Sequence, residues 1–176
     1  MIVRQFRMTI PIPQILAAVL AFVAVAGCGG GGTADDKAAA EWALKHGGTI
    51  NIVGSILKVD SVEDLPEESF EVQKIDLNQV EPPITDKDLE QMPASENLVY
   101  LGLHSAKITD KGLDPLLKLS GLKELELSYT EVGDNGLDQL AAMKTLTKLY
   151  LYGTSVSDDA VEQFQKKRSD CKVYRD

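Results

Sequence analysis

Apolar residues recur with a period of 24 through the second half of the chain. Three successive segments, residues 98–116, 122–140 and 146–164, carry the same order of apolar, acidic and small positions. Each segment opens with apolar residues spaced L-x-x-L-x-L and continues with a branched aliphatic residue two positions before an aspartate. A fixed period of this length indicates a small structural unit stacked several times.

The first half of each unit is predicted to be a short strand. In the middle copy Leu125 and Leu127 alternate with Glu124, Glu126 and Ser128. A period of two places the leucines on a buried face and the polar residues on an exposed face. Like strands in successive copies then form a parallel sheet with a spacing of ~4.8 Å.

The second half of each unit is predicted to be a short helix that covers the other side. Leu137, Leu140 and Met143 follow one another at three-residue steps, which suits one helical face. Asp134 precedes them at the position expected for a helix N-cap, with its carboxylate free to accept backbone N–H groups.

These motifs resemble the leucine-rich repeat, in the bacterial form with a T-D-x-G-L turn after the strand, here residues 109–113. The resemblance implies an α/β solenoid of about four coils, with a parallel sheet on the concave side and short helices on the convex side. A degenerate first coil contains Val72, Ile75 and Leu77, so the repeats span residues 72–165.

Solenoids need caps, because an uncovered end would expose a layer of core. We assign residues 35–71 to an N-terminal cap and 166–176 to a C-terminal cap. Residues 33–36 fit a capping box that starts a cap helix, and Trp42 on that helix is the expected plug; a ligand-stacking Trp42 is the alternative. One or two short strands follow, with these apolar residues: Ile50, Ile52, Ile56 and Val59.

The first 27 residues are predicted to be a signal peptide. Arg4 and Arg7 precede an apolar run at residues 15–26, which is too short to span a bilayer, and the run ends in Val-Ala-Gly before Cys28. This ending resembles the bacterial lipobox, which implies that Cys28 becomes the lipidated first residue. An ordinary signal peptide with an incidental cysteine is the alternative. Residues 28–34, rich in glycine, are predicted to be a flexible tether.

The charge of the chain argues against nucleic acid as a partner. The sequence has 18 Lys and Arg against 27 Asp and Glu, a net charge of −9. Nucleic-acid binding needs a basic footprint, and the chain lacks the charge for one.

Candidate chemistry is sparse, so we expect no catalytic, cofactor-binding or metal-binding residue. The two histidines, His46 and His104, belong to no H-x-x-x-H motif, and no C-x-x-C motif occurs. Glu124 and Glu126 form a carboxylate pair, but on an open face they would be solvated and unsuited to hydrolysis. Cys171 is expected to be buried in a final strand and inert, with a reactive nucleophile as the alternative.

The outward positions of the strands form the candidate binding face. Tyrosine on such a face suits protein binding, because it buries area and keeps a polar tip, although its β propensity is an equal explanation. The candidate residues are Tyr100, His104, Glu124, Glu126, Lys148, Tyr150 and Tyr152.

Together these features favour a non-catalytic module that binds a protein and is anchored through Cys28. The chain is expected to be exported and lipid-anchored to the cell membrane or the outer membrane, facing the periplasm or the cell exterior. A structural envelope component is the main alternative, and a glycan-binding protein or a hydrolase is a further one.

Overall fold

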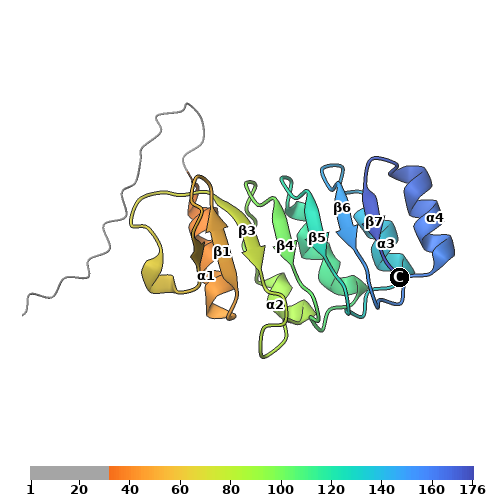
Figure 1. Cartoon of the computed structure of the whole chain (residues 1–176), viewed down its shortest axis with the longest axis horizontal. Helices are drawn as coiled ribbons and strands as arrows, with labels where there is room; N and C mark the ends of the chain where they lie inside the picture. Colours follow the sequence, from red (N-terminus) through yellow and green to blue (C-terminus); the bar gives the residue numbers. More distant parts are fainter. Residues whose placement is uncertain (1–31) are drawn as a thin grey trace, which may run out of the picture.

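The computed structural model describes residues 32–176 as one row of stacked coils, which follow one another along the long axis (Figure 1). A seven-stranded sheet runs through all of them in the order β2-β1-β3-β4-β5-β6-β7. Its strands are β1 (Thr49–Ile52), β2 (Lys58–Val59), β3 (Val72–Asp76), β4 (Tyr100–Gly102), β5 (Glu124–Glu126), β6 (Lys148–Tyr150) and β7 (Lys172–Tyr174). The helical segments are α1 (Ala34–Lys45), η1 (Val62–Asp64), α2 (Asp86–Glu90), η2 (Asp110–Lys118), α3 (Asp134–Leu140) and α4 (Asp158–Lys167), with η marking 3₁₀ turns.

Strands β3 to β7 are parallel, and from β4 onward each residue pairs with the one 24 positions later in the chain. Leu125 pairs with Leu101 on one side and Leu149 on the other, and all three side chains are fully buried. The stacked leucines form a continuous core that a single coil could not bury. The predicted α/β leucine-rich-repeat solenoid is therefore confirmed.

The helical segments cover the convex side, but they are not uniform. Leu137 and Leu140 of α3 are buried as their spacing predicts. In the preceding coil Pro115 lies inside η2, which starts at Asp110 behind the N-cap Thr109. From the sequence alone, Asp114 is expected to cap this helix and Pro115 to be its first residue, but the structure places Pro115 in its interior, so this expectation is wrong. Because proline has no N–H and clashes with the preceding turn of an α-helix, this coil adopts 3₁₀ geometry instead.

The aspartate that recurs at the start of each repeat's helical segment binds the next coil rather than capping its own helix. The carboxylate of Asp134 accepts the Ser157 N–H at 2.7 Å and the Ser157 hydroxyl at 2.8 Å. Ser157 is the N-cap of α4, whereas Gly133 is the N-cap of the helix that contains Asp134. The prediction that Asp134 caps its own helix is therefore wrong.

Two earlier coils repeat this inter-coil contact. Asp86 accepts the N–H and hydroxyl of Thr109 at 2.8 and 2.7 Å, and Asp110 accepts the Gly133 N–H at 2.7 Å. Each aspartate is the first residue of its helical segment and binds the N-cap residue of the following one. Adjacent coils are thus joined on the convex side as well as through the sheet.

The N-terminal end is closed by α1 and an antiparallel hairpin. Strand β1 pairs with β3 and β2, so Ile50 lies between Ile75 and Val59. The capping box predicted for α1 is present between Thr33 and Asp36, and Trp42 is buried in the core as predicted for a plug.

Asp36 does more than cap its helix, because its fully buried carboxylate also reaches the loop before β4. It accepts the Ser95 hydroxyl at 2.5 Å and the Asn97 amide at 2.9 Å. Burial alone would raise the pKa of Asp36, but hydrogen bonds from Ser95, Thr33 and Asn97 together lower it. This contact fixes the cap to the first full coil.

The C-terminal end is closed by α4 and β7. Arg168, 2% exposed, ends α4 and turns its guanidinium inward, where it donates to the carbonyls of Met143 and Leu146 in the loop before β6. Its other partner is the Asp170 carboxylate, at 2.9 Å. From the sequence alone, Lys166, Lys167 and Arg168 are expected to end this helix with positive charge that balances its dipole, and the buried contacts of Arg168 add a second role.

Candidate interaction surface

The polar face of the sheet consists of in-register rows that cross the coils. The first row follows the register from Lys74 through β4, β5 and β6 to Lys172, and the second runs from Asp76 to Tyr174. In full, the rows are Lys74, Tyr100, Glu124, Lys148 and Lys172, and Asp76, Gly102, Glu126, Tyr150 and Tyr174. Because parallel strands lie ~4.8 Å apart, neighbouring residues in a row are in contact range.

Aromatic rings gather at the C-terminal end of these rows. The rings of Tyr150 and Tyr174 stack with their centroids 4.6 Å apart and their planes 10° from parallel. The Lys172 ammonium lies 4.6 Å from the centroid of the Tyr174 ring, a cation–π distance. Tyr152, two residues after the end of β6, is exposed. We call these three side chains, Tyr150, Tyr152 and Tyr174, the aromatic platform.

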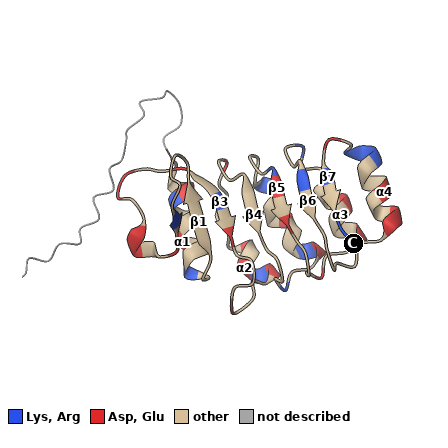
Figure 2. Ribbon diagram, viewed as in Figure 1, with Lys and Arg blue, Asp and Glu red and all other residues tan. Residues whose placement is uncertain are grey.

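The carboxylates beside the platform are held by neighbouring groups. Glu124 on β5 forms an ion pair with Lys148 on β6 at 2.8 Å, and Figure 2 shows acidic and basic residues side by side on these strands. The hydrogen bond to Glu124 and its charge raise the pKa of Lys148. Glu126 accepts the Ser128 N–H at 2.7 Å. The two glutamates therefore bind different partners.

The N-terminal half of the face is built around Tyr100. Its hydroxyl accepts the Asn78 amide at 3.2 Å, and the Lys74 ammonium lies 5.9 Å from the ring centroid. Burial, followed by the nearby carboxylates, raises the pKa of Tyr100. Burial likewise raises the pKa of Tyr150, helped by Glu124. Both hydroxyls thus stay protonated at neutral pH and can donate hydrogen bonds.

Residues in the left-handed conformation mark the exit of each strand of the repeat. Gln79, Ser105, Tyr129 and Gly153 have φ values of 55°, 64°, 58° and 62°. A Cβ at Gly153 would lie 2.8 Å from the Tyr129 ring, so glycine there leaves room for the tyrosine. Tyr129 also meets the ring of His104 edge-on at 5.1 Å and is 60% exposed.

Comparisons with known proteins give only distant structural likenesses. No family model matches the chain. No curated protein matches it either. Internalin C2 of Listeria monocytogenes aligns with 24% identity and a TM-score of 0.37, over 46% of this chain and 33% of that chain. A second internalin of that organism, inlF, aligns with 18% identity and a TM-score of 0.34, over 46% of this chain and 28% of that one.

This chain therefore corresponds to about a third of the length of the internalin chains that it matches. The fold class itself stands on the register of the sheet and the repeated coil described above.

The sheet places six of the seven candidate residues on neighbouring strands. Glu124, Glu126, Lys148, Tyr150 and Tyr152 lie on β5, β6 and the exit of β6, and Tyr100 pairs with Glu124. The seventh, His104, turns toward Tyr129 at the strand exits. Ser128 was predicted to point outward, and this is wrong. It is buried because its hydroxyl accepts the Tyr152 N–H at 3.1 Å.

Sequence reasoning missed three residues of this surface. Lys172 and Tyr174 lie 24 positions after Lys148 and Tyr150, so extending the period by one coil would have found them. Tyr129 gave no such signal, because its column holds unrelated residue types and its exposure follows from a left-handed turn.

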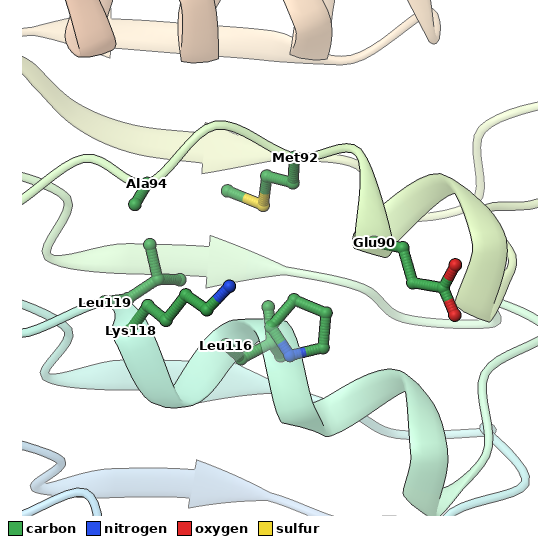
Figure 3. A pocket seen from close by; sticks show the side chains of 7 residues that line it. Glu90, Met92, Ala94, Leu116, Lys118 and Leu119 are labelled. Atoms are coloured by element: carbon green, nitrogen blue, oxygen red, sulfur yellow. The ribbon is translucent and has the colours of Figure 1, made fainter.

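A small crevice on the opposite side has no features of an active site. It has a volume of about 110 Å³ and lies between η2 and the segment that follows α2, with Met92, Leu116 and Leu119 among its lining (Figure 3). The crevice is smaller than ligand pockets, which usually measure ~300–1,000 Å³, whereas a hollow of about 730 Å³ between β2 and the loop that follows it falls within that range. Its charged residues, Glu90 and Lys118, come from opposite walls.

Residues 32–176 contain neither a metal-binding cluster nor a membrane-spanning helix. No group of three His, Cys, Asp or Glu side chains within this range is arranged to hold a metal ion. None of the helices in the same range is long and apolar enough to cross a membrane.

The two cysteines differ in what the structure says of them. Cys28 and the predicted signal peptide lie outside the described residues. Cys171 is a free thiol, fully buried just before β7, and burial raises its pKa to about 11. An inert thiol follows from this environment, as the sequence predicts.

Proposed function

We propose that this chain is a non-catalytic protein-binding module, anchored at the cell envelope through a lipidated Cys28. The observation that carries the binding assignment is the stacked pair Tyr150 and Tyr174 beside the exposed Tyr152. Tyrosine anchors supply large contact area at little entropic cost and often dominate interface energies. The aromatic platform is already in place, so a partner need not order it.

The charges around the platform support a protein partner. Lys148 and Glu124 alternate in sign along one row, and Lys172 extends it by another positive charge. Mixed charges around an aromatic centre give specificity and orientation in protein interfaces. Because Glu124 and Glu126 are held by Lys148 and Ser128, they do not form the paired acid and base that a hydrolase needs.

The anchor assignment is supported by the sequence around Cys28. The apolar run, the small residues and the cysteine together resemble a lipobox, and Cys28 lies four positions before the first described residue, Gly32. Metabolic labelling with a fatty-acid probe tests it directly, since wild type should incorporate the probe and Cys28→Ser should not. An unlabelled wild-type protein would refute the anchor.

The binding assignment is tested by recovery of envelope proteins with purified variants. Tyr150→Ala combined with Tyr174→Ala should abolish capture of a specific partner, because each anchor contributes ~2 kcal/mol or more. Lys118→Ala and Leu117→Ala, both exposed on η2, form a matched control. Circular dichroism first confirms that each variant folds. Equal recovery by the tyrosine variant and wild type would remove the site from this face.

A further inference from the structure

The turn between β1 and β2 exposes a cluster of apolar side chains at the N-terminal end. Val53 is 44% exposed, Ile56 97% and Leu57 54%. Half of the large hydrophobic side chains exposed among residues 32–176 lie in this five-residue turn. The sequence pattern assigned Ile56 to a strand of the cap, but it lies in the turn and faces solvent.

The turn is held in shape, so the exposure is a feature of the fold. Gly54 adopts a φ of 80°, and the Ser55 N–H donates to the Ile52 carbonyl at 3.1 Å. The Leu57 N–H donates to the Ser55 hydroxyl, also at 3.1 Å. These bonds hold the turn at Val53 and Gly54 in place, with Ile56 and Leu57 directly after it.

The first described residue, Gly32, lies near this turn. Gly32 lies against the backbone of Phe70, and the Val53 N–H donates to the carbonyl of the next residue, Glu71, at 2.9 Å. The start of α1 and the β1–β2 turn therefore share one edge of the molecule. The strands of the repeat also begin at this edge, because β3 starts at Val72.

The distance from Cys28 to this edge is short. Gly32 is four positions after Cys28, and a fully extended chain spans at most ~3.6 Å per residue, or ~14 Å in all. A lipid on Cys28 would therefore hold this edge within that reach of the bilayer surface. The aromatic platform, at the far end of the sheet, would stay away from the lipid.

We propose that the β1–β2 turn is a second membrane contact, with Val53, Ile56 and Leu57 inserted among lipid headgroups. This inference rests on the proposed anchor at Cys28 and extends it. Apolar side chains at an interface bind in proportion to the area they bury, and an acyl anchor supplies the high local concentration that a small tip needs. The contact fixes the orientation of the sheet relative to the membrane.

The charges around the turn predict which lipids it accepts. Lys58 is paired with Asp76 at 3.2 Å, and the neighbouring loop carries Glu63, Asp64, Glu67 and Glu68 beside a hollow of about 730 Å³. This environment gives no attraction to anionic lipid. Insertion should therefore occur in phosphatidylcholine alone and should not increase when phosphatidylglycerol is added.

The test places an environment-sensitive fluorophore on Ile56→Cys in the full chain, purified from bacterial membranes and reconstituted in phosphatidylcholine vesicles. A lipidated Cys28 has no free thiol and Cys171 is fully buried, so the new cysteine is the reactive one. Glu131→Cys, exposed after the exit of β5 at the opposite edge, is the matched control. Mass spectrometry of the N-terminal peptide establishes whether Cys28 carries acyl chains.

The inference predicts a blue shift of the label at position 56 and loss of its emission when nitroxide-labelled lipid is present, with neither change at 131. Val53→Ser combined with Leu57→Ser should reverse the shift at 56, which excludes partition of the label by itself. If Cys28 is acylated and the label at 56 behaves as the label at 131, the membrane contact is refuted while the anchor stands.

Two other results would also overturn the inference. A shift at 56 without vesicles that grows with protein concentration would mean that a second copy covers the turn. An N-terminal peptide without acyl chains would refute the anchor and, with it, the contact that depends on it.

Discussion

The two ends of the solenoid are closed by buried charges of opposite sign. At the N-terminal end the Asp36 carboxylate accepts hydrogen bonds from the loop before β4, and at the C-terminal end the Arg168 guanidinium donates to the loop before β6. Both loops lead into a strand of the sheet. An uncovered coil exposes backbone and side-chain polar groups as well as leucines, so a cap must satisfy both.

The same two ends present different surfaces to their surroundings. The N-terminal end carries an antiparallel hairpin with the apolar turn at Ile56, whereas the C-terminal end continues the parallel rows and carries the stacked Tyr150 and Tyr174. A hairpin interrupts the repeat and so leaves side chains without neighbours. A further parallel strand extends the repeat and so builds a continuous face. This difference is the reason for proposing a membrane contact at the N-terminal end and a protein contact at the C-terminal end.

A substitution in the middle of the solenoid should give the largest loss of stability, and the losses at the two ends can be compared with it. Leu125→Ala removes a fully buried side chain stacked between two leucines and should cost ~2–5 kcal/mol. Chemical denaturation measures it. A loss below ~0.5 kcal/mol, the range of surface substitutions, would contradict the assigned core.

Disrupting the closure of the C-terminal end should give the next largest loss of stability. Arg168→Met keeps much of the side-chain volume but leaves the buried Leu146 carbonyl without a donor, and it leaves the Met143 carbonyl with the Leu146 N–H alone, at a cost of ~3 kcal/mol. Lys166→Met, exposed on the same helix, is the control and should change stability little. Equal effects of the two substitutions would mean that Arg168 does not hold this end.

The N-terminal closure should be weaker and dependent on pH. Asp36→Asn should cost ~1–3 kcal/mol, because an amide cannot accept from Ser95, Asn97 and Thr33 together. The pKa of Asp36 is lowered in the folded protein, so its stabilisation is complete above its ordinary pKa.

That stabilisation is lost as the pH falls through the lowered folded-state pKa. Unfolding free energies of wild type and Asp36→Asn should therefore converge between about pH 5 and pH 2. A difference between the two proteins that stays constant over this range would contradict the role given to the carboxylate.

The smallest expected signal is the reactivity of Cys171. Its pKa of about 11 and full burial leave almost no thiolate at neutral pH, so alkylation of the folded protein should be slow. Denaturant should make it rapid. The variant Arg168→Met, in which this end should be loosened, serves as the comparison. Alkylation of the native wild-type protein as fast as that of the variant would show that the C-terminal end does not protect Cys171.

The sequence period predicted much of the fold, because stacking a repeat fixes the neighbours of each position. The row of Leu101, Leu125 and Leu149 and the polar rows beside it follow from a spacing of 24 and an alternation of two. Most of the candidate face was predictable for the same reason, and Lys172 and Tyr174 were within reach of the same rule.

Contacts between different kinds of element were not predictable in this way. The partners of Asp36 lie about 60 residues away in a loop without a repeat signature, and Asp134 binds the next coil instead of its own helix. Ile56 shows a further limit, since an apolar residue near a strand is assumed to face the core. Here a turn at Gly54 carries it away from the sheet.

The division of roles between the two ends can be tested by one photo-crosslinking measurement on intact cells. A photoreactive residue at Tyr152, beside the aromatic platform, is compared with one at Ile56 on the hairpin turn, followed by mass spectrometry. The account predicts a discrete protein adduct from position 152 and lipid adducts without a discrete protein from position 56. A discrete protein adduct from position 56, with none from position 152, would contradict it.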